Sequence, residues 1–379
     1  MSILISPDSF KGSLSALEVS QAIEKGIQMV NPDITTLKVP LADGGEGTKE
    51  AMIEATEGKK LTVETTDALG RTINAQYGIT GNNNTAIVEL AAASGLDKIE
   101  ENDLNPSIAS TFGTGVLIRH AIENGSKRFI ICLGGSAAND GGLGILKGLG
   151  FRFKDKHGLL VDEGGLSLMK IAEIDDSQIV KGLNECEFKI ACDVTNPFVE
   201  EKGASHVFGP QKGASTTVIK NLDKSLNHFA DVIEEKYEVK IHNMEGAGAA
   251  GGVAGGLCGC LKAELCSGFD LVASTLNLKK VLSGNDIELI VTGEGQLDSQ
   301  TENGKVISGI TTLGNQFEVP SIALVGGIQS ITNSLYDQGL IAVFSIVNKP
   351  MSLSQSIANA ADLITKQTEQ IIRLYLAKN

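Results

Sequence analysis

The sequence predicts an α/β protein in which a flavodoxin-like, doubly wound parallel sheet domain carries a second, mixed α/β domain inserted into it. Two observations lead there. Apolar strand-like runs alternate with helix-sized amphipathic segments at both ends of the chain, and the middle of the chain shows a different alternation. Apolar residues make up 42% of the 379 residues and glycine occurs 44 times, so an aliphatic core with many tight loops is expected.

The first sixty residues alternate strand, helix, strand, helix. Residues 3–6 are an apolar run, and residues 15–30 carry apolar side chains at helical spacing. Ser15 and Glu18 fit a capping box at the start of this helix, and Asn31 with Pro32 ends it. A second strand at residues 35–42 leads through the loop DGGEG into a helix that begins TKEAM. This order opens a doubly wound sheet.

The last hundred residues return to the same alternation. We expect strands at IELIVTG, SIALVGG and IAVFSIV, a helix at KVISGITTLGNQ, and one long amphipathic helix over residues 352–378. Two early strands and three late strands make a five-stranded sheet. We therefore assign residues 1–59 and 283–379 to one discontinuous domain.

The middle of the chain, residues 60–282, is assigned to the inserted domain. Its first thirty residues, LTVETTDALGRTINAQYGITGNNNTAIVEL, alternate apolar and polar side chains across turn signals, which favours antiparallel hairpins. Helices and strands then mix. The active site is expected in a cleft between the two domains.

Charge and composition exclude several classes of protein. The formal net charge of −14 disfavours binding to nucleic acid or to an anionic membrane surface, because both need a basic footprint. No secretory signal and no apolar run of membrane-spanning length is found, so a cytoplasmic protein is expected. The six cysteines form no CxxC pair, which favours reduced thiols over zinc. The sequence does not decide oligomeric state, and a homodimer stays open.

Polar and charged side chains follow five of the predicted strands, where open parallel sheets bind their ligands. They are Asp8, Lys11, Asp43, Glu46, Ser136, Asn139, Asp140, Asp193, Asn196, Glu294 and Asp298. Any one of them could be only a turn or capping residue. The repetition of one chemistry favours a magnesium–nucleotide site, since Mg²⁺ takes carboxylates together with phosphate oxygens, and glycines let backbone N–H groups approach phosphates.

Other catalytic motifs fail. Gly304 and Lys305 are followed by valine and so do not complete a Walker A loop. The single GxGxxG match runs from Gly246 to Gly251 but lacks a buried strand before it, which favours close packing at a helix start over dinucleotide binding. The five histidines show no spacing typical of a hydrolase triad or a zinc site.

Eight motifs spread over nearly the whole chain resemble those of the bacterial type-1 glycerate kinases. They are SPDSFKGS, PLADGGEGT, DALGR, LGGSAANDGG, ACDVTNP, FGPQKGA, GAGAAGG and TGEGQLDSQTENGK. The resemblance implies phosphorylation of D-glycerate by ATP with Mg²⁺, with 2-phosphoglycerate favoured over 3-phosphoglycerate as the product. One departure is Ala138, where the family motif leads us to expect threonine.

Roles for individual residues follow from strand-end position together with the resemblance. Catalytic roles are expected for Lys11, Asp193 and Asp298, and substrate binding for Asp8, Arg71 and Lys212. Nucleotide binding is expected for Gly134, Gly135, Ser136, Asn139, Gly293 and Gly295, and metal binding for Asp43 and Glu294. From position alone, Lys11 could equally be a solvated loop lysine, Asp193 a turn residue, and Arg71 half of a surface ion pair.

Two alternatives stay open at this point. A regulatory protein that binds a small metabolite without catalysis could keep the same cleft, although such a protein has no need of metal-binding carboxylates. A kinase for another small hydroxy acid or polyol would use the same phosphate-binding parts, because the shape of the substrate pocket decides which acceptor binds.

Overall fold

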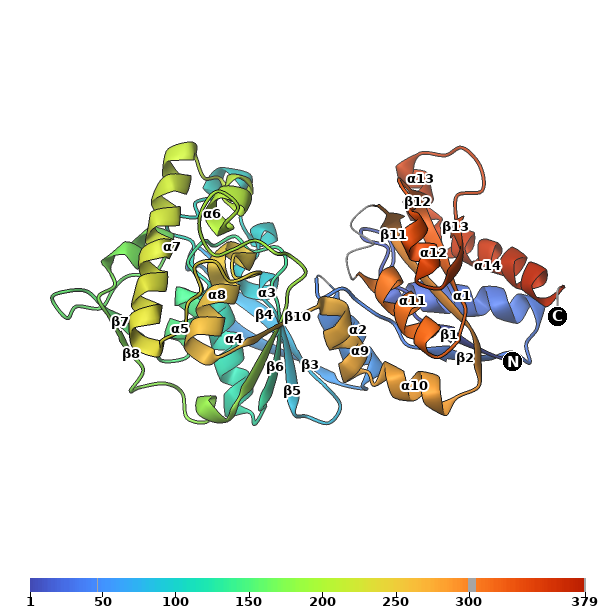
Figure 1. The fold of residues 1–379 in the computed structure, drawn as a ribbon, viewed down its shortest axis with the longest axis horizontal. Helices are drawn as coiled ribbons and strands as arrows, with labels where there is room; N and C mark the ends of the chain where they lie inside the picture. The colour runs from blue at the N-terminus through green and yellow to red at the C-terminus, as the bar shows by residue number, and fades with distance from the viewer. Residues whose placement is uncertain (46, 299–304, 378–379) are drawn as a thin grey trace. The chain divides into compact units, whose positions relative to one another are not determined.

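The computed structural model describes residues 1–45, 47–298 and 305–377, and its contacts divide the chain into two units (Figure 1). The first unit comprises Met1–Asp43, Glu50–Ala55 and Ser267–Asn379, and the second comprises Gly44–Lys49 and Thr56–Cys266. Residues 267–282, which the sequence pattern placed in the inserted domain, belong to the first unit by their contacts. Helix α2 (Thr48–Ala55) contributes residues to both units.

The first unit is built on a five-stranded parallel sheet in the order β13-β12-β11-β1-β2. Its strands are β1 (Ser2–Ile5), β2 (Thr35–Lys38), β11 (Ile287–Leu297), β12 (Ser321–Ile328) and β13 (Leu340–Ser345). The chain winds outward from β1 on one side and from β11 on the other. This is the flavodoxin-like order that was predicted, and its switch point lies between β1 and β11.

Helices cover both faces of this sheet (Figure 1). Ile322 and Leu324 pack with α1 (Ala16–Val30) and α14 (Ala360–Leu376), whereas the alternating residues Ala323 and Val325 pack with α11 (Val306–Gln316) and α12 (Asn333–Asp337). The remaining helices of the unit are α9 (Gly268–Thr275), α10 (Leu278–Gly284) and α13 (Leu353–Ala358).

The second unit contains a six-stranded mixed sheet in the order β10-β9-β6-β5-β4-β3. Its strands are β3 (Lys59–Thr66), β4 (Thr72–Ile79), β5 (Thr85–Glu89), β6 (Arg128–Cys132), β9 (Glu187–Ala191) and β10 (Glu264–Cys266). Strands β5, β6, β9 and β10 run parallel, while β4 is antiparallel to both β3 and β5. The predicted antiparallel hairpins are therefore confirmed. A separate ribbon pairs β7 (Arg152–Lys154) with β8 (Glu173–Asp175).

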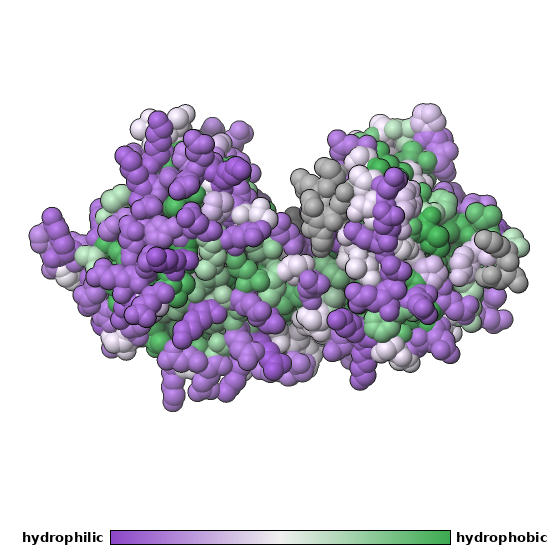
Figure 2. Space-filling view, in the orientation of Figure 1, coloured by the Kyte–Doolittle hydropathy of each residue, from purple (hydrophilic) through white to green (hydrophobic). Residues whose placement is uncertain are grey.

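The helices of the second unit are α3 (Ala91–Ser94), α4 (Phe112–Glu123), α5 (Leu143–Gly148), α6 (Ala204–Phe208), α7 (Thr216–Tyr237) and α8 (Ala249–Leu261). Five short 3₁₀ helices join them: η1 (Leu96–Lys98), η2 (Glu101–Asp103), η3 (Gly165–Lys170), η4 (Leu183–Glu185) and η5 (Pro210–Lys212). Helix α7 is amphipathic. Its residues Leu226, Phe229 and Ile233 join the buried core, and Figure 2 shows hydrophilic residues over its outer face.

Local predictions fare differently at the two ends of the chain. The capping box is present, because the Ser15 hydroxyl accepts the N–H of Glu18 and the Glu18 carboxylate accepts the N–H of Ser15. The prediction of one uninterrupted C-terminal helix is wrong: α13 and α14 are separated at Asn359 (φ −111°, ψ 11°), whose N–H and side-chain amide both donate to the carbonyl of Gln355. Within the described residues, no helix is both long and apolar enough to cross a membrane.

Candidate active site

The charges of two carboxylates, Asp43 and Glu294, act on a third, Asp8, in the first unit. Asp8 follows β1 and is 8% exposed, and its carboxylate accepts the N–H of Ser9 at 2.6 Å. Burial is the main cause that raises the pKa of Asp8 to about 7, with the charges of Asp43 and Glu294 adding to it. The Ser9 hydrogen bond and the charge of Lys11 act in the opposite direction. The structure therefore brings together Asp8, Asp43 and Glu294, which we call the acidic cluster.

Glu294 belongs to strand β11 rather than to a loop after it. The predicted strand IELIVTG ended at Gly293, but β11 continues to Leu297, and Glu294 pairs in register with Val325 of β12. Glu294 is 8% exposed. Asp298 is the residue that follows the strand, and it is partly buried. The expected placement of Glu294 just beyond a strand end is thus wrong, because the strand is four residues longer than predicted.

The two glycines that flank Glu294 lie in different surroundings. A Cβ at Gly293 would lie 2.2 Å from the carbonyl oxygen of Leu324, so the neighbouring strand already requires glycine there. A Cβ at Gly295 would lie 3.4 Å from the Cα of Phe10 and 3.5 Å from the backbone nitrogen of Lys11. Gly295 therefore stands directly beside the loop that carries Lys11. A contact of either glycine with nucleotide stays a prediction.

Lys11 lies in a tight loop between β1 and α1, with an exposed side chain. The loop is closed by two backbone hydrogen bonds between Phe10 and Leu14, at 2.9 and 3.0 Å. The Lys11 charge reaches Asp8 and lowers its pKa, against the larger effect of burial. Lys11 is therefore a cation whose charge acts on Asp8 of the acidic cluster. Glu46, which was also expected near it, lies outside the described residues.

In the second unit, Asp140 anchors the glycine-rich loop that follows β6. Its carboxylate accepts hydrogen bonds from the N–H and hydroxyl of Thr111 (2.8 and 2.9 Å) and from the N–H groups of Gly142 and Gly144 (both 3.1 Å). The side chain is fully buried, and burial raises its pKa against these four hydrogen bonds. With its lone pairs engaged in this way, Asp140 has a structural role, one of the two that its position suggested.

The rest of this loop places small and polar groups near its surface. Gly134 and Gly135 are exposed, while Ser136 and Asn139 are buried. The Asn139 amide donates to the hydroxyl of Ser205 at 2.9 Å, but its side-chain oxygen is buried without a hydrogen-bond partner among the described residues. Such an oxygen is costly unless water or a ligand donates to it.

Lys212 brings a buried amine to the same loop. It is 1% exposed, and its Nζ donates a short hydrogen bond to the carbonyl oxygen of Ala138. Burial lowers the pKa of Lys212 to about 7, and the charge of Asp140 opposes this shift. Position 138, where threonine was expected, thus contributes its backbone oxygen, while the Ala138 side chain lies in a small apolar cluster.

Asp193 and Arg71 lie in separate surroundings. Asp193 lies two residues after the end of β9, close to the strand end as predicted, and its side chain is exposed. Arg71 donates through Nε to Asp67 at 2.5 Å, and its Nη1 lies 3.5 Å from Asp103. Burial disfavours the ionised form of Asp67, but hydrogen bonds from Arg71 and Leu69 outweigh it and lower its pKa. The Arg71 guanidinium therefore holds the DALGR turn together.

Sequence reasoning missed a second anchored loop. Glu89 ends strand β5, and its carboxylate accepts the N–H groups of Gly47 and Lys49 at 3.1 and 3.2 Å and the Lys49 ammonium at 3.1 Å. The motif PLADGGEGT is therefore fixed at its C-terminal end to a parallel strand of the second unit. The sequence does contain a signal for this residue: Glu89 ends the apolar run TAIVE, just as the other candidate residues follow the ends of predicted strands.

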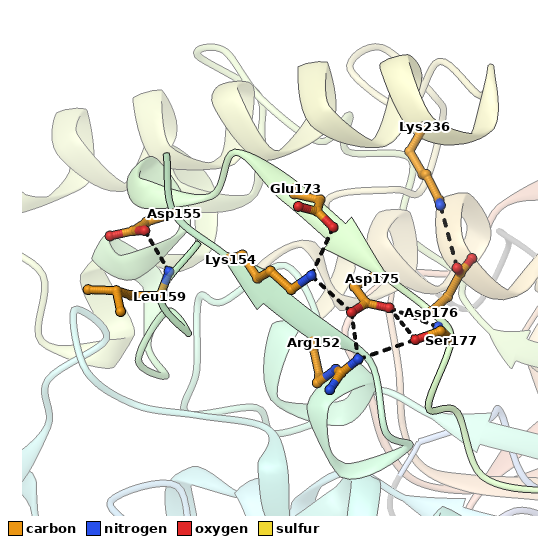
Figure 3. Close-up of polar contacts among 9 residues, drawn as sticks. All are labelled: Arg152, Lys154, Asp155, Leu159, Glu173, Asp175, Asp176, Ser177 and Lys236. Atoms are coloured by element: carbon orange, nitrogen blue, oxygen red, sulfur yellow. Dashed lines mark hydrogen bonds and ion pairs between the residues drawn. The ribbon is translucent and has the colours of Figure 1, made fainter. Parts of the chain in front are cut away.

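Another group of charges in the second unit lies on the ribbon β7–β8 (Figure 3). Arg152 lies 2.7 Å from Asp175, and Lys154 lies 3.0 Å from both Asp175 and Glu173. The hydroxyl and N–H of Ser177 donate to Asp175 at 2.6 and 3.0 Å. These bonds to Ser177, followed by those from Lys154 and Arg152, lower the pKa of Asp175. None of these residues was expected in the active site.

The acidic cluster supplies the ligand type that Mg²⁺ prefers. Its donors are carboxylate oxygens, which are hard ligands, and Mg²⁺ needs only one or two of them when phosphate oxygens and water complete the octahedron. Burial raises the pKa of Asp8, and the neighbouring negative charges of Asp43 and Glu294 add to this shift; a bound cation would relieve that repulsion. Among the described residues, no group of three or more His, Cys, Asp or Glu side chains is spaced to hold a metal by itself. The chemistry fits an ion shared with a ligand.

Comparison with known proteins gives a consistent result over the whole chain. The model of the glycerate kinase family matches residues 3–376. A protein of Escherichia coli (strain K12) named glycerate 2-kinase is 43% identical over 371 residues, covering 98% of this chain and 97% of the relative. A Bacillus subtilis (strain 168) protein named glycerate kinase is 41% identical, with 98% and 97% covered. A crystal structure assigned to a candidate glycerate kinase 2 of Salmonella typhimurium LT2 superposes with a TM-score of 0.92 at 42% identity, covering 100% of this chain and 99% of that one.

Proposed function

Because the chain belongs to the glycerate kinase family, and is therefore a phosphotransferase that acts on an alcohol group, we propose that it transfers the terminal phosphoryl group of ATP to the 2-hydroxyl of D-glycerate with the help of Mg²⁺. The name of the Escherichia coli relative, glycerate 2-kinase, supports the position of the phosphate. The observation that carries the proposal is the acidic cluster beside Lys11, at the switch point of the first unit's parallel sheet.

The first unit would supply charge control. Asp43 and Glu294 would hold Mg²⁺, which neutralises charge on the phosphate oxygens when it is bound. Lys11 would stabilise the charge of the transferred phosphoryl group, and Asp8 would orient the acceptor. Asp298, at the end of β11, would accept the proton of the reacting hydroxyl.

The second unit would supply binding groups. Gly134, Gly135, Ser136 and Asn139 belong to one loop whose glycines leave the backbone open to solvent, which suits contact with phosphate. Lys212 would meet an anionic group of a reactant, and Asp193 would act at the reacting centre from the end of β9. Arg71 has weaker support, because its guanidinium already binds Asp67 and Asp103.

We further propose that the enzyme works in the cytoplasm, without nucleic-acid or membrane partners. All six cysteines are free thiols, as expected in a reducing compartment. The net charge of −14 opposes binding to polyanions.

A coupled ADP assay tests the activity. Purified protein should release ADP when D-glycerate, ATP and Mg²⁺ are all present and not when any one is omitted, and phosphorus NMR should identify 2-phosphoglycerate. A panel of other small hydroxy acids and glycerol provides the comparison. ADP release with glycerol and none with glycerate would refute the proposed substrate, and a 3-phosphoglycerate signal would correct the position of transfer.

Replacing Lys11 tests the charge-control role. Lys11→Ala should lower kcat by roughly a hundredfold, which is typical for the loss of one electrostatic donor. Lys25→Ala, a change of the same kind at an exposed position on α1, should leave kcat unchanged. Equal kinetics for the two variants would remove Lys11 from the site.

A further inference from the structure

Lys212 is a buried cation without a matching anion at contact distance. An ammonium has three N–H donors, and the one acceptor found for it among the described residues is the carbonyl oxygen of Ala138. No carboxylate within the described ranges lies within 4.0 Å of its Nζ. The Asp140 carboxylate accepts its hydrogen bonds from Thr111, Gly142 and Gly144 instead. Folding gains little from such an amine, because desolvation of its charge is costly.

The backbone beside Lys212 is held in an unusual conformation. Ala250, Gly251 and Gly252 have φ values of 56°, 72° and 88°, so three consecutive residues are left-handed where α8 begins, and one of them is not glycine. Left-handed alanine is disfavoured by its Cβ and persists only when surrounding contacts impose it. We call these three residues the left-handed turn.

Close contacts impose this conformation. The N–H of Gly141 donates to the carbonyl of Gly251 at 3.1 Å, and the Ser136 hydroxyl lies 3.4 Å from the carbonyl of Ala250. A Cβ at Gly251 would lie 2.3 Å from the Ala138 carbonyl oxygen and 2.9 Å from the Lys212 Nζ. The left-handed turn, the loop after β6 and the Lys212 amine therefore meet at one point.

The turn also has hydrogen-bond donors to offer. The carbonyls of Ala250 and Gly251 are engaged as described. Their N–H groups lie in the first turn of α8, where no helix residue precedes them by three or four positions, and no acceptor outside the helix is found for them in the described part of the chain. Ala250 is partly exposed, and Gly134 and Gly135 of the facing loop are exposed. A buried amine and two unused N–H groups thus lie near a surface that a small solute can reach. All of these groups are donors, which suits an anion.

We propose that Lys212 and the left-handed turn Ala250–Gly252 form a subsite that binds an anionic oxygen group of a reactant, either the carboxylate of the hydroxy acid or a phosphate of the nucleotide. The inference rests on the proposed function for the identity of the reactants. It adds the backbone of the turn to the site and gives a reason for its strained alanine. The lowered pKa of Lys212 agrees with a site that becomes fully charged only when its anion is bound.

The test compares Lys212→Met with Lys154→Met. Methionine keeps the length and apolar stem of lysine but removes the charge, and Lys154 is a lysine of the same unit whose carboxylate partners lie on the ribbon β7–β8. Lys212→Met should lower kcat/KM by about a hundredfold with an unchanged or raised Tm, because it removes a buried charge. Lys154→Met should keep its kcat/KM.

Separate titration of the two reactants identifies the anion. A raised KM for glycerate alone assigns the carboxylate, and a raised KM for ATP alone assigns a phosphate. Values of kcat/KM within about threefold of wild type for both reactants would overturn the proposal. If wild-type protein does not phosphorylate glycerate, the proposed function fails, and calorimetric binding of glycerate, ATP and inorganic phosphate to wild type and Lys212→Met still tests the subsite.

Wild-type protein also carries a test that needs no variant. With a free pKa of about 7, the amine is mostly neutral at pH 8 and mostly charged at pH 6, and Asp140 is the titratable group whose charge acts on it. Binding of the assigned reactant, followed by calorimetry in two buffers of different ionisation enthalpy, should take up close to one proton at about pH 8 and far less at about pH 6. Absence of uptake at pH 8 would contradict the subsite.

The left-handed turn is tested by Ala250→Val. A β-branched side chain strongly disfavours positive φ, so the turn should relax away from Lys212. The variant should raise KM for the same reactant as Lys212→Met does. A raised KM for the other reactant, or for neither, would separate the turn from the lysine.

Discussion

On the ribbon β7–β8, Arg152 and Lys154 lie within 3.0 Å of carboxylates, whereas Lys212 in the same unit donates to a single carbonyl oxygen. The ribbon charges are partly exposed, so water lowers the cost of each charge and pairing fixes the two short strands (Figure 3). The Lys212 amine is 1% exposed, and no carboxylate in the described part of the chain forms an ion pair with it. The charges on the ribbon are therefore accounted for by their partners within the chain, whereas the buried charge of Lys212 is not.

The difference separates charges that serve folding from charges that serve a ligand. A paired surface charge has its partner in the same chain, and replacing it changes little besides local order. A buried charge without a partner lowers the stability of the folded protein, and such groups concentrate at functional sites. Asp8 in the first unit is, like Lys212, a candidate for a charge that serves a ligand, because burial and two neighbouring carboxylates raise its pKa to about 7.

The largest effect is expected for Asp8→Asn. The change keeps the shape and the oxygen that accepts the Ser9 N–H, but it removes the charge, so kcat/KM should fall by roughly a hundred- to a thousandfold. The free energy of unfolding, by contrast, should be higher in the variant than in wild type at neutral pH. The folded-state pKa of about 7 exceeds the unfolded value of 3.8, so the folded protein binds the proton more tightly, and wild type loses stability relative to Asp8→Asn as pH rises from about 4 to 7.

Urea unfolding in the presence of EDTA checks this prediction. The two proteins should unfold at similar urea concentrations near pH 4, and the variant should be more stable by a few kcal/mol above pH 7. Asp33→Asn, at an exposed position before β2, is the matched control and should show neither effect. A variant that is less stable than wild type at pH 8 would mean that the Asp8 charge supports the fold.

The sheet order and most elements of the first unit could be predicted because their signals are local. Apolar runs, a capping box and helical spacing each lie within about fifteen residues, and strand order followed from alternation. The helix break at Asn359 was missed, since its amphipathic pattern continues through both α13 and α14. The true end of β11 was missed as well: Gly293 and Gly295 suggested a loop, but the carbonyl of Leu324 requires glycine inside the strand.

The site could be predicted in part. Strand-end position selected Asp8, Asp43 and Lys11, and the charges of Asp43 and Lys11 do act on Asp8. Glu294 was selected for the same reason but acts on Asp8 from within β11. The roles of these residues stay predictions. It could not show that Thr111 binds the Asp140 carboxylate, that the Arg71 guanidinium reaches Asp103, or that Lys212 is buried. Alanine at position 250 gave no signal, because a left-handed residue is visible only when the contacts that impose it are known.

A smaller effect, confined to stability, is expected for the pH response of Lys212. Its folded-state pKa of about 7 lies below the unfolded value of 10.5, so between these values the unfolded chain binds more protons and wild type gains stability as pH rises. The stability of Lys212→Met should exceed that of wild type by up to a few kcal/mol at pH 7, and the gap should narrow towards pH 10. Denaturant titrations at several pH values measure it, and a gap that stays constant would indicate that the amine is not desolvated.

The smallest effect is expected for Asp175→Asn on the ribbon. The pKa of Asp175 is lowered by the bonds from Ser177, Lys154 and Arg152, so its contribution to stability is fully present above the unfolded value of 3.8 and is lost progressively as pH falls from there through the lower folded-state pKa. The variant should show a slightly lower Tm at pH 7, a smaller difference near pH 3, and also a smaller difference at about 1 M salt, where the screening length falls to roughly 3 Å. Its kcat and both KM values should match those of wild type. Asp175→Asn could instead lose activity, as Lys212→Met is expected to. In that case, ion pairing within the chain would not distinguish structural charges from functional ones, and the ribbon residues would belong to the active site.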